Sequence, residues 1–279
     1  MAKRKLEELN LLDDFLFGSM VTYPGIGEEF SRELLKIIFK RDFGKLKIVP
    51  QNMFYGNDTE LHGARLDVCI EDEEMELDLG DVGEIYDVEP EQNSDKKSVE
   101  VLPKRVRFYH AVIDTRSLRS GAQYDKLKNV YIIMIVPFDP FGLNRMVYTI
   151  QNGCREVPDM PYEDGAKTIF LYTKGVEGNP SEELRQLLCY MEHTTKDNVK
   201  NKTLEKIHQM VERVKQDEEV SLRFMKSWER DAMIREEGRE EGREEGRIEG
   251  LKQGREEAAL EIRRLKEELE RLKKEKLPQ

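Results

Sequence analysis

Two segments in the first third of the chain alternate apolar and polar residues with the period of two that is typical of half-buried β-strands. They cover residues 63–70 and 83–92 and are separated by a polar stretch that begins with Glu71-Asp72-Glu73-Glu74, which we expect to be a loop. The pattern therefore predicts a β-hairpin. In that hairpin, Asp67 and Glu89 would come together on one face of the sheet.

Other periodic segments predict helices packed against further strands. Residues 28–41 carry an amphipathic apolar stripe, and residues 130–136 form an apolar, β-branched run that suits a central strand covered on both faces. Proline at a first helical position predicts that a helix over 104–116 starts at Pro103. Further strands are expected at 45–54, 145–151 and 168–173, and further helices at 11–20, 181–193 and 199–230. Because Pro50 lies in the first of these strands, we expect an edge position or a break there.

The C-terminal part of the chain has a different pattern. From Glu236 onwards Glu-Glu-Gly-Arg recurs, so that glycine returns every four residues, which predicts a marginal solvated helix or an extensible linker. Beyond the repeat, apolar residues with 3-4-3 spacing predict a short coiled-coil seam: Ile262, Leu265, Leu269 and Leu272. This seam is the predicted route to a homo-oligomer.

These patterns divide the chain into three parts. Residues 1–175 form the predicted α/β core domain, in which helices pack against a mixed sheet. Residues 176–232 form a helical extension, and residues 233–279 form the glycine-repeat and coiled-coil tail.

The net charge of the chain bears on whether it binds nucleic acid. The net charge is −11, and thirteen acidic residues and two lysines lie between residues 71 and 100. The strongly basic patch that usually marks nucleic-acid binding is therefore missing, which argues against tight metal-free DNA binding. It does not exclude a nuclease whose metal ion offsets the local negative charge.

Cysteine usage and hydropathy indicate a compartment. The three cysteines are widely spaced and read as free thiols in a reducing environment, and the dispersed histidines argue against zinc. No signal peptide and no run of 18 apolar residues occurs, so we expect a cytoplasmic protein without a membrane partner.

The acidic residues of the predicted hairpin suggest a metal site. Carboxylates clustered on neighbouring strands repel one another unless something neutralises them. Mg²⁺ binds one or two protein carboxylates and can support displacement at phosphorus. Acidic residues on the open face of a strand can also be simply solvated, and the spacing alone leaves both interpretations open.

The order of the motifs carries a resemblance. Gly-x-Arg-x-Asp at 63–67 is followed by Tyr-Asp-Val-Glu at 86–89, by Leu-Pro-Lys-Arg at 102–105 and by Arg-Phe-Tyr-His at 107–110. This order resembles the PD-(D/E)XK nuclease superfamily, specifically the Rpn-type branch of transposase-like, recombination-promoting nucleases. The resemblance implies a restriction-endonuclease-like core with a mixed central sheet flanked by helices. It also implies an Mg²⁺-dependent DNA endonuclease, with Mn²⁺ as an alternative ion.

The resemblance also assigns the site. Asp67 and Glu89 match the metal ligands, and the third catalytic position is Glu91, or Gln92 if Pro90 marks a one-residue bulge. This sequence departs from the family pattern, which has Lys or Gln at the third position. Glu91 would be either another metal ligand or the mark of a weakened site.

Two further groups of residues have both a functional and a structural interpretation. The helix after the hairpin would bring Lys104, Arg105 and Arg107 near a substrate phosphate, or these would simply be solvated cations. Asp13 and Asp14 lie at the start of the first helix, where an acidic residue either joins the metal site or caps the helix.

Three functions follow from this reading. The first is a metal-dependent DNA endonuclease. The second is a catalytically weakened nuclease fold that binds DNA or a protein. The third is a coiled-coil interaction protein whose globular part is a scaffold.

Overall fold

The computed structural model of the chain describes residues 4–50, 53–54, 64–65, 68–72, 83–118 and 120–275. The chain divides into two units, Met1–Ser221 and Leu222–Gln279. The first unit is α/β, as the sequence predicts, and is built on a mixed, open sheet of six strands in the order β1-β4-β5-β6-β8-β7. Within the described ranges, no helix is both long enough and apolar enough to cross a membrane.

The strands of this sheet are β1 (Leu46–Pro50), β4 (Val68–Asp72), β5 (Glu84–Pro90), β6 (Asn129–Val136), β7 (Val147–Gln151) and β8 (Ala166–Tyr172). A separate pair consists of β2 (Met53–Phe54) and β3 (Ala64–Arg65). The helices are α1 (Asp14–Thr22), α2 (Gly27–Phe39), α3 (Lys96–Ser117), α4 (Glu182–Glu192), α5 (Lys202–Lys215) and α6 (Glu218–Glu275). Short 3-10 turns cover Leu6–Glu8, Tyr124–Lys126 and Lys196–Asn198.

The predicted hairpin is confirmed as the antiparallel pair β4 and β5, in which Cys69 lies opposite Asp87. Strand β5 also runs parallel to β6, and β6 runs parallel to β8. A parallel pair needs a crossover connection, which α3 provides between β5 and β6. The apolar run at 130–136 is therefore the central strand that its sequence predicts. Strand β1 lies at the sheet edge and ends at Pro50, as expected for a strand that contains proline.

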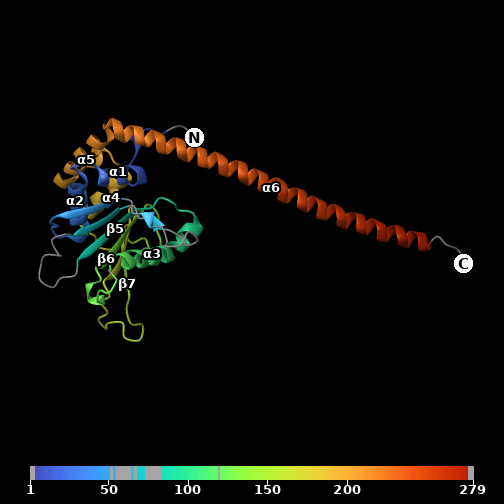
Figure 1. Cartoon of the computed structure of the whole chain (residues 1–279), viewed down its shortest axis with the longest axis horizontal. Helices are drawn as coiled ribbons and strands as arrows, with labels where there is room; N and C mark the ends of the chain where they lie inside the picture. The colour runs from blue at the N-terminus through green and yellow to red at the C-terminus, as the bar shows by residue number, and fades with distance from the viewer. Residues whose placement is uncertain are drawn as a thin grey trace. The chain divides into compact units, whose positions relative to one another are not determined.

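Helices cover both faces of the sheet. On one face, α3 buries Leu102, Val106 and Ile113 against Ile85 and the inward residues of β6. Figure 1 shows α1, α2, α4 and α5 gathered together, apart from α3. The aromatic ring of Tyr86 packs on this second side against the rings near the end of α2. Alternate residues of β5 thus enter two separate packed layers.

Some predicted boundaries are wrong. The loop expected from Glu71 is wrong for its first two residues, because β4 continues to Asp72 and pairs Glu71 with both Ile85 and Lys47. The rest of this expected loop, residues 73–82, lies outside the described residues. The amine of Lys47 lies 3.3 Å from the carboxylate of Glu71 and offsets its charge within the strand. The single strand expected over 63–70 instead contributes to two sheets, through β3 and β4.

Two predicted helix boundaries also need correction. Helix α3 begins at Lys96 rather than at Pro103, because the Asp95 side chain caps it by accepting a hydrogen bond from the Ser98 amide at 3.0 Å. Pro103 lies inside the helix. The helix expected over 199–230 is divided into α5 and α6, and the side chain of Asp217 accepts from the Val220 amide at 2.9 Å at the start of α6.

Candidate functional site

Two acidic side chains lie buried on the same face of the central strand β5. Every residue of this strand is buried. Because Ile85 packs in the core beneath α3, alternation places Asp87 and Glu89 on that same face. Asp87 is fully buried and Glu89 is 5% exposed. Burying carboxylates is costly unless they are paired, hydrogen-bonded or bound to a cation, so this face of β5 is the strongest candidate site in the described part of the chain.

The positively charged side chain of Arg105, on α3, lies beyond Asp87 and Glu89, next to Glu91. The Arg105 guanidinium lies 2.6 Å from a carboxylate oxygen of Glu91, and both side chains are mostly buried. Burial acts to lower the pKa of Arg105, but the hydrogen bond to Glu91 and the electrostatic interactions with Tyr109, Glu91 and Glu89 outweigh it and raise the pKa. The guanidinium also lies over the ring of Tyr109. Arg105 is therefore a permanent positive charge beside the acidic end of β5.

Glu91 and Gln92 are directed to different partners. The Glu91 carboxylate also accepts a hydrogen bond from the backbone amide of Asn93 at 2.6 Å. The side-chain amide of Gln92 instead donates to the backbone carbonyl of Leu12, just before α1, at 2.5 Å. In the fully described ladder of β5 with β6, pairing is one-to-one as far as Pro90, and the Glu91 amide donates to the Ile135 carbonyl. The bulge that would favour Gln92 is thus absent from this ladder.

The other predicted residues near the site have simpler surroundings. Lys104 and Arg107 are exposed on α3, on either side of the partly buried Arg105. At the start of α1, the side chain of Asp13 accepts from the Phe15 amide at 3.2 Å, so the capping interpretation of this residue is confirmed. Burial raises the pKa of Asp13, although the charge of Arg4 opposes the shift.

A histidine of α3 lies over a neighbouring part of the same sheet face. The Nε2 atom of His110 lies 3.1 Å from the hydroxyl of Thr168 in β8. Burial lowers the pKa of His110, and the charge of Asp164 partly opposes this shift. Burial and the same Asp164 charge raise the pKa of Asp114, one turn further along α3. The contact between His110 and Thr168 is therefore a half-buried polar contact between α3 and the sheet.

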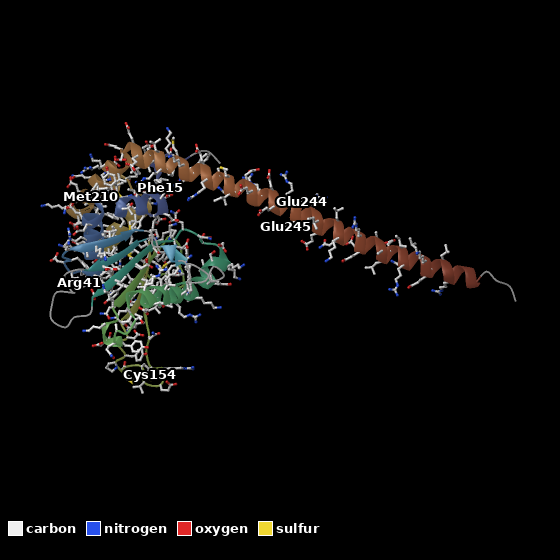
Figure 2. All side chains as sticks on the ribbon, viewed as in Figure 1. Phe15, Arg41, Cys154, Met210, Glu244 and Glu245 are labelled. Atoms are coloured by element: carbon white, nitrogen blue, oxygen red, sulfur yellow. The ribbon has the colours of Figure 1, made fainter. Side chains whose placement is uncertain are left out.

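The opposite face of β5 holds a third buried acid, Glu84, whose carboxylate has local hydrogen-bond partners. Arg41, labelled in Figure 2, hydrogen-bonds both the carboxylate of Glu84 and the hydroxyl of Tyr86. The hydroxyl of Tyr131 lies 3.3 Å from Glu84, and the rings of Tyr86 and Tyr131 are stacked. Burial, followed by the hydrogen bond to Glu84, raises the pKa of Tyr86. These contacts give Glu84 a structural role.

The predicted metal site is described only in part. Asp67 lies outside the described residues, and among the residues that the structure does describe, no group of three His, Cys, Asp or Glu side chains could hold a metal ion. The carboxylates of Asp87 and Glu89 are the hard oxygen type of ligand that Mg²⁺ takes. Their chemistry fits this ion, and a complete site needs at least one further ligand.

No family model matches the sequence, and comparison with curated proteins and with solved structures returns no match. The resemblance to PD-(D/E)XK nucleases therefore stays a prediction from the motifs.

One residue of the site, Asp87, and one contact, between Arg105 and Glu91, are not predicted by the sequence. Alternation in the second strand already placed Asp87 on the face of Glu89, but nothing in that pattern distinguishes a buried carboxylate from a solvated one. The pairing of Arg105 with Glu91 depends on how α3 lies over the strand end, and the sequence contained no signal for it.

Proposed function

We propose that the chain is a metal-dependent endodeoxyribonuclease of the Rpn-type PD-(D/E)XK class, which hydrolyses phosphodiester bonds and has a role in DNA recombination. The observation that carries this proposal is the pair of buried carboxylates, Asp87 and Glu89, on one face of β5. Burying two carboxylates costs free energy, and a bound divalent cation would offset this cost.

In this proposal, Glu89 and Asp67 hold the ion. The hairpin register supports their pairing, because Glu71 lies opposite Ile85 and Cys69 opposite Asp87. A hairpin that kept this register for two more residues would pair Asp67 with Glu89. Mg²⁺, or Mn²⁺ in its place, would supply a Lewis acid and a bound water of lowered pKa.

The remaining residues of the proposed site supply positive charge. Arg105 acts as a positioning residue, because its ion pair holds the Glu91 carboxylate at the end of β5 and balances its charge. The exposed cations Lys104 and Arg107 on the same helix would contact backbone phosphates of DNA. Cys154 and Cys189 are free thiols. A reducing, cytoplasmic environment remains part of this proposal.

Plasmid nicking by the purified chain tests this proposal. We expect nicking with Mg²⁺ or Mn²⁺, none with EDTA, and none from the folded variants Asp67→Ala and Glu89→Ala. A folded wild-type chain that nicks DNA with neither ion would overturn the proposal.

One observation favours a second candidate function, a weakened nuclease fold that binds DNA or a protein. The Glu91 carboxylate is occupied by Arg105 and by the Asn93 amide, so the third catalytic position contributes a neutralised acid rather than a lysine. DNA binding by the wild-type chain without cleavage, retained in Glu89→Ala, would select this function.

The C-terminal helix gives the protein a proposed route to self-association. Helix α6 is continuous to Glu275 and carries exposed apolar side chains at Ile262, Leu265 and Leu269. These are three of the four positions of the coiled-coil seam expected from the sequence.

A further inference from the structure

The apolar seam of α6 is longer than the 3-4-3 run at its end. Counting back in heptads from Ile262 as position a places Ile248 and Arg255 at a, and Leu251 and Ala258 at d. The helix is unbroken through this whole stretch, so these positions share one side of it. The sequence continues the pattern to Leu272, which extends the seam over residues 248–272.

The large apolar side chains of this seam are exposed in a single chain. Ile248, Leu251, Ile262, Leu265 and Leu269 are each between 50 and 56% exposed. Figure 2 shows side chains projecting from α6 beyond the labelled Glu244 and Glu245, toward its C-terminal end. Repeated apolar exposure on one helix side indicates a surface that another chain covers.

The glycine repeat lowers the intrinsic stability of α6, so this helix would gain stability from packing against a partner helix. Five glycines recur in α6, at Gly238, Gly242, Gly246, Gly250 and Gly254. Each costs about 1 kcal/mol relative to alanine in a helix interior. Since most helical stability in proteins comes from packing of an apolar face, a solvated helix with this many glycines gains stability by covering its seam.

The charges beside the seam identify the partner and its direction. Glu261 is at position g and Lys266 at the following position e, and the sequence repeats this arrangement at Glu268 and Lys273. In a parallel pair of identical chains, position g of one helix meets the following e of the other, which places glutamate against lysine in these two heptads. At the start of the seam the same geometry places Arg247 against Lys252, so the charge complementarity lies in the C-terminal half of the seam. In an antiparallel pair, g meets g and e meets e, so like charges would face each other.

The seam residues also indicate the number of strands. Isoleucine at a with leucine at d favours two strands over three or four. The Ile262 and Leu265 layers, like those of Ile248 and Leu251, have this arrangement. The polar Arg255 at a would fix the register at some cost in stability.

We propose that residues 248–272 form a parallel, two-stranded coiled coil with a second copy of this chain. This inference rests on the proposed self-association and not on the proposed nuclease activity. Its tests use the mass and the cross-linking of the full chain and need no DNA.

The first test compares two leucines of the same helix. Leu265 lies in the seam, whereas Leu260 is at position f on the outer side and is 67% exposed. Light scattering should give the wild-type chain and Leu260→Asp twice the mass of one chain, and Leu265→Asp the mass of one chain. A monomeric wild-type chain, or one with three or four copies, would overturn the proposal.

The second test determines direction. In a parallel pair, Leu251→Cys and Leu269→Cys each face their own copy, close enough for a disulfide. In an antiparallel pair over residues 248–272, Leu251 would face Leu269, so cross-links would need a mixture of the two variants. We expect each variant alone to form disulfide-linked dimers on oxidation that the parent chain, with its native cysteines, does not form. Cross-linking only in the mixture would show an antiparallel pair and overturn the proposed direction.

Discussion

The guanidinium of Arg105 on α3 lies 2.6 Å from the carboxylate of Glu91, just beyond the end of β5. This ion pair joins the strand that carries the buried Asp87 and Glu89 to the helix that carries the exposed cations. Both the local fold and the proposed chemistry therefore depend on it.

The ion pair should contribute measurably to stability. In a double-mutant cycle with Arg105→Met and Glu91→Gln, we expect a coupling free energy of about 1.5–3 kcal/mol, the usual range for hydrogen bonds to charged groups. Urea unfolding measures the four free energies. Arg107→Met, which removes an exposed cation of the same helix, should change stability by less than about 0.5 kcal/mol. A coupling of zero would contradict a stabilising role for this ion pair.

Exposed cations of α3 should set the salt dependence of DNA binding. Replacing Lys104 or Arg107 by alanine should weaken binding to all sequences alike and reduce the slope of log affinity against log salt by about 1. Lys126 is a matched control, because it is exposed and precedes β6, at the opposite end of the parallel strands. Fluorescence anisotropy over a salt series measures the slopes. Equal slopes for the Lys104 and Lys126 variants would contradict the proposed contact surface.

His110 should make stability depend on pH. Its pKa in the folded chain is lowered from the ordinary value of 6.5, chiefly by burial, so the unfolded chain binds a proton at higher pH than the folded chain does. The free energy of unfolding must therefore fall as pH decreases through this value. Between about pH 8 and pH 5, the range in which a histidine titrates, the wild-type chain should lose more stability than His110→Gln. Parallel curves for the two proteins would count against a buried, neutral His110.

Two kinds of glycine should respond oppositely to alanine. An added Cβ at Gly246 meets nothing within 4 Å, so Gly246→Ala should stabilise α6 by about 1 kcal/mol. An added Cβ at Gly175 would lie 2.5 Å from backbone atoms of Met146, so Gly175→Ala should destabilise the first unit by about 1–3 kcal/mol. Circular dichroism melting measures both effects. A stabilising Gly175→Ala would contradict this packing.

Local patterns in the sequence predicted much of the fold. Period-two alternation led to the hairpin of β4 and β5, and the apolar run at 130–136 led to the central strand, because these features follow from side chains within one segment. The start of α3 was missed because Pro103 is a familiar helix-start signal, whereas the cap at Asp95 lies in a polar stretch that reads as a loop.

The site was less predictable because its features depend on distant segments. Sequence reasoning grouped Arg105 with Lys104 and Arg107, yet the way α3 packs on the sheet brings only Arg105 of these three against Glu91. The structural role of Glu84 depends on Arg41, which follows α2 and comes from a distant part of the chain. No periodicity within either segment signals such a contact.

A comparison of two buried glutamates of β5 tests the central claim most directly. Glu84 and Glu89 are 6% and 5% exposed and lie on opposite faces of the same strand. Plasmid nicking in Mg²⁺ should survive in Glu84→Gln and disappear in Glu89→Gln, with circular dichroism confirming that both variants are folded. Equal nicking by the two variants would contradict the assignment of the α3 face of β5 as the nuclease site.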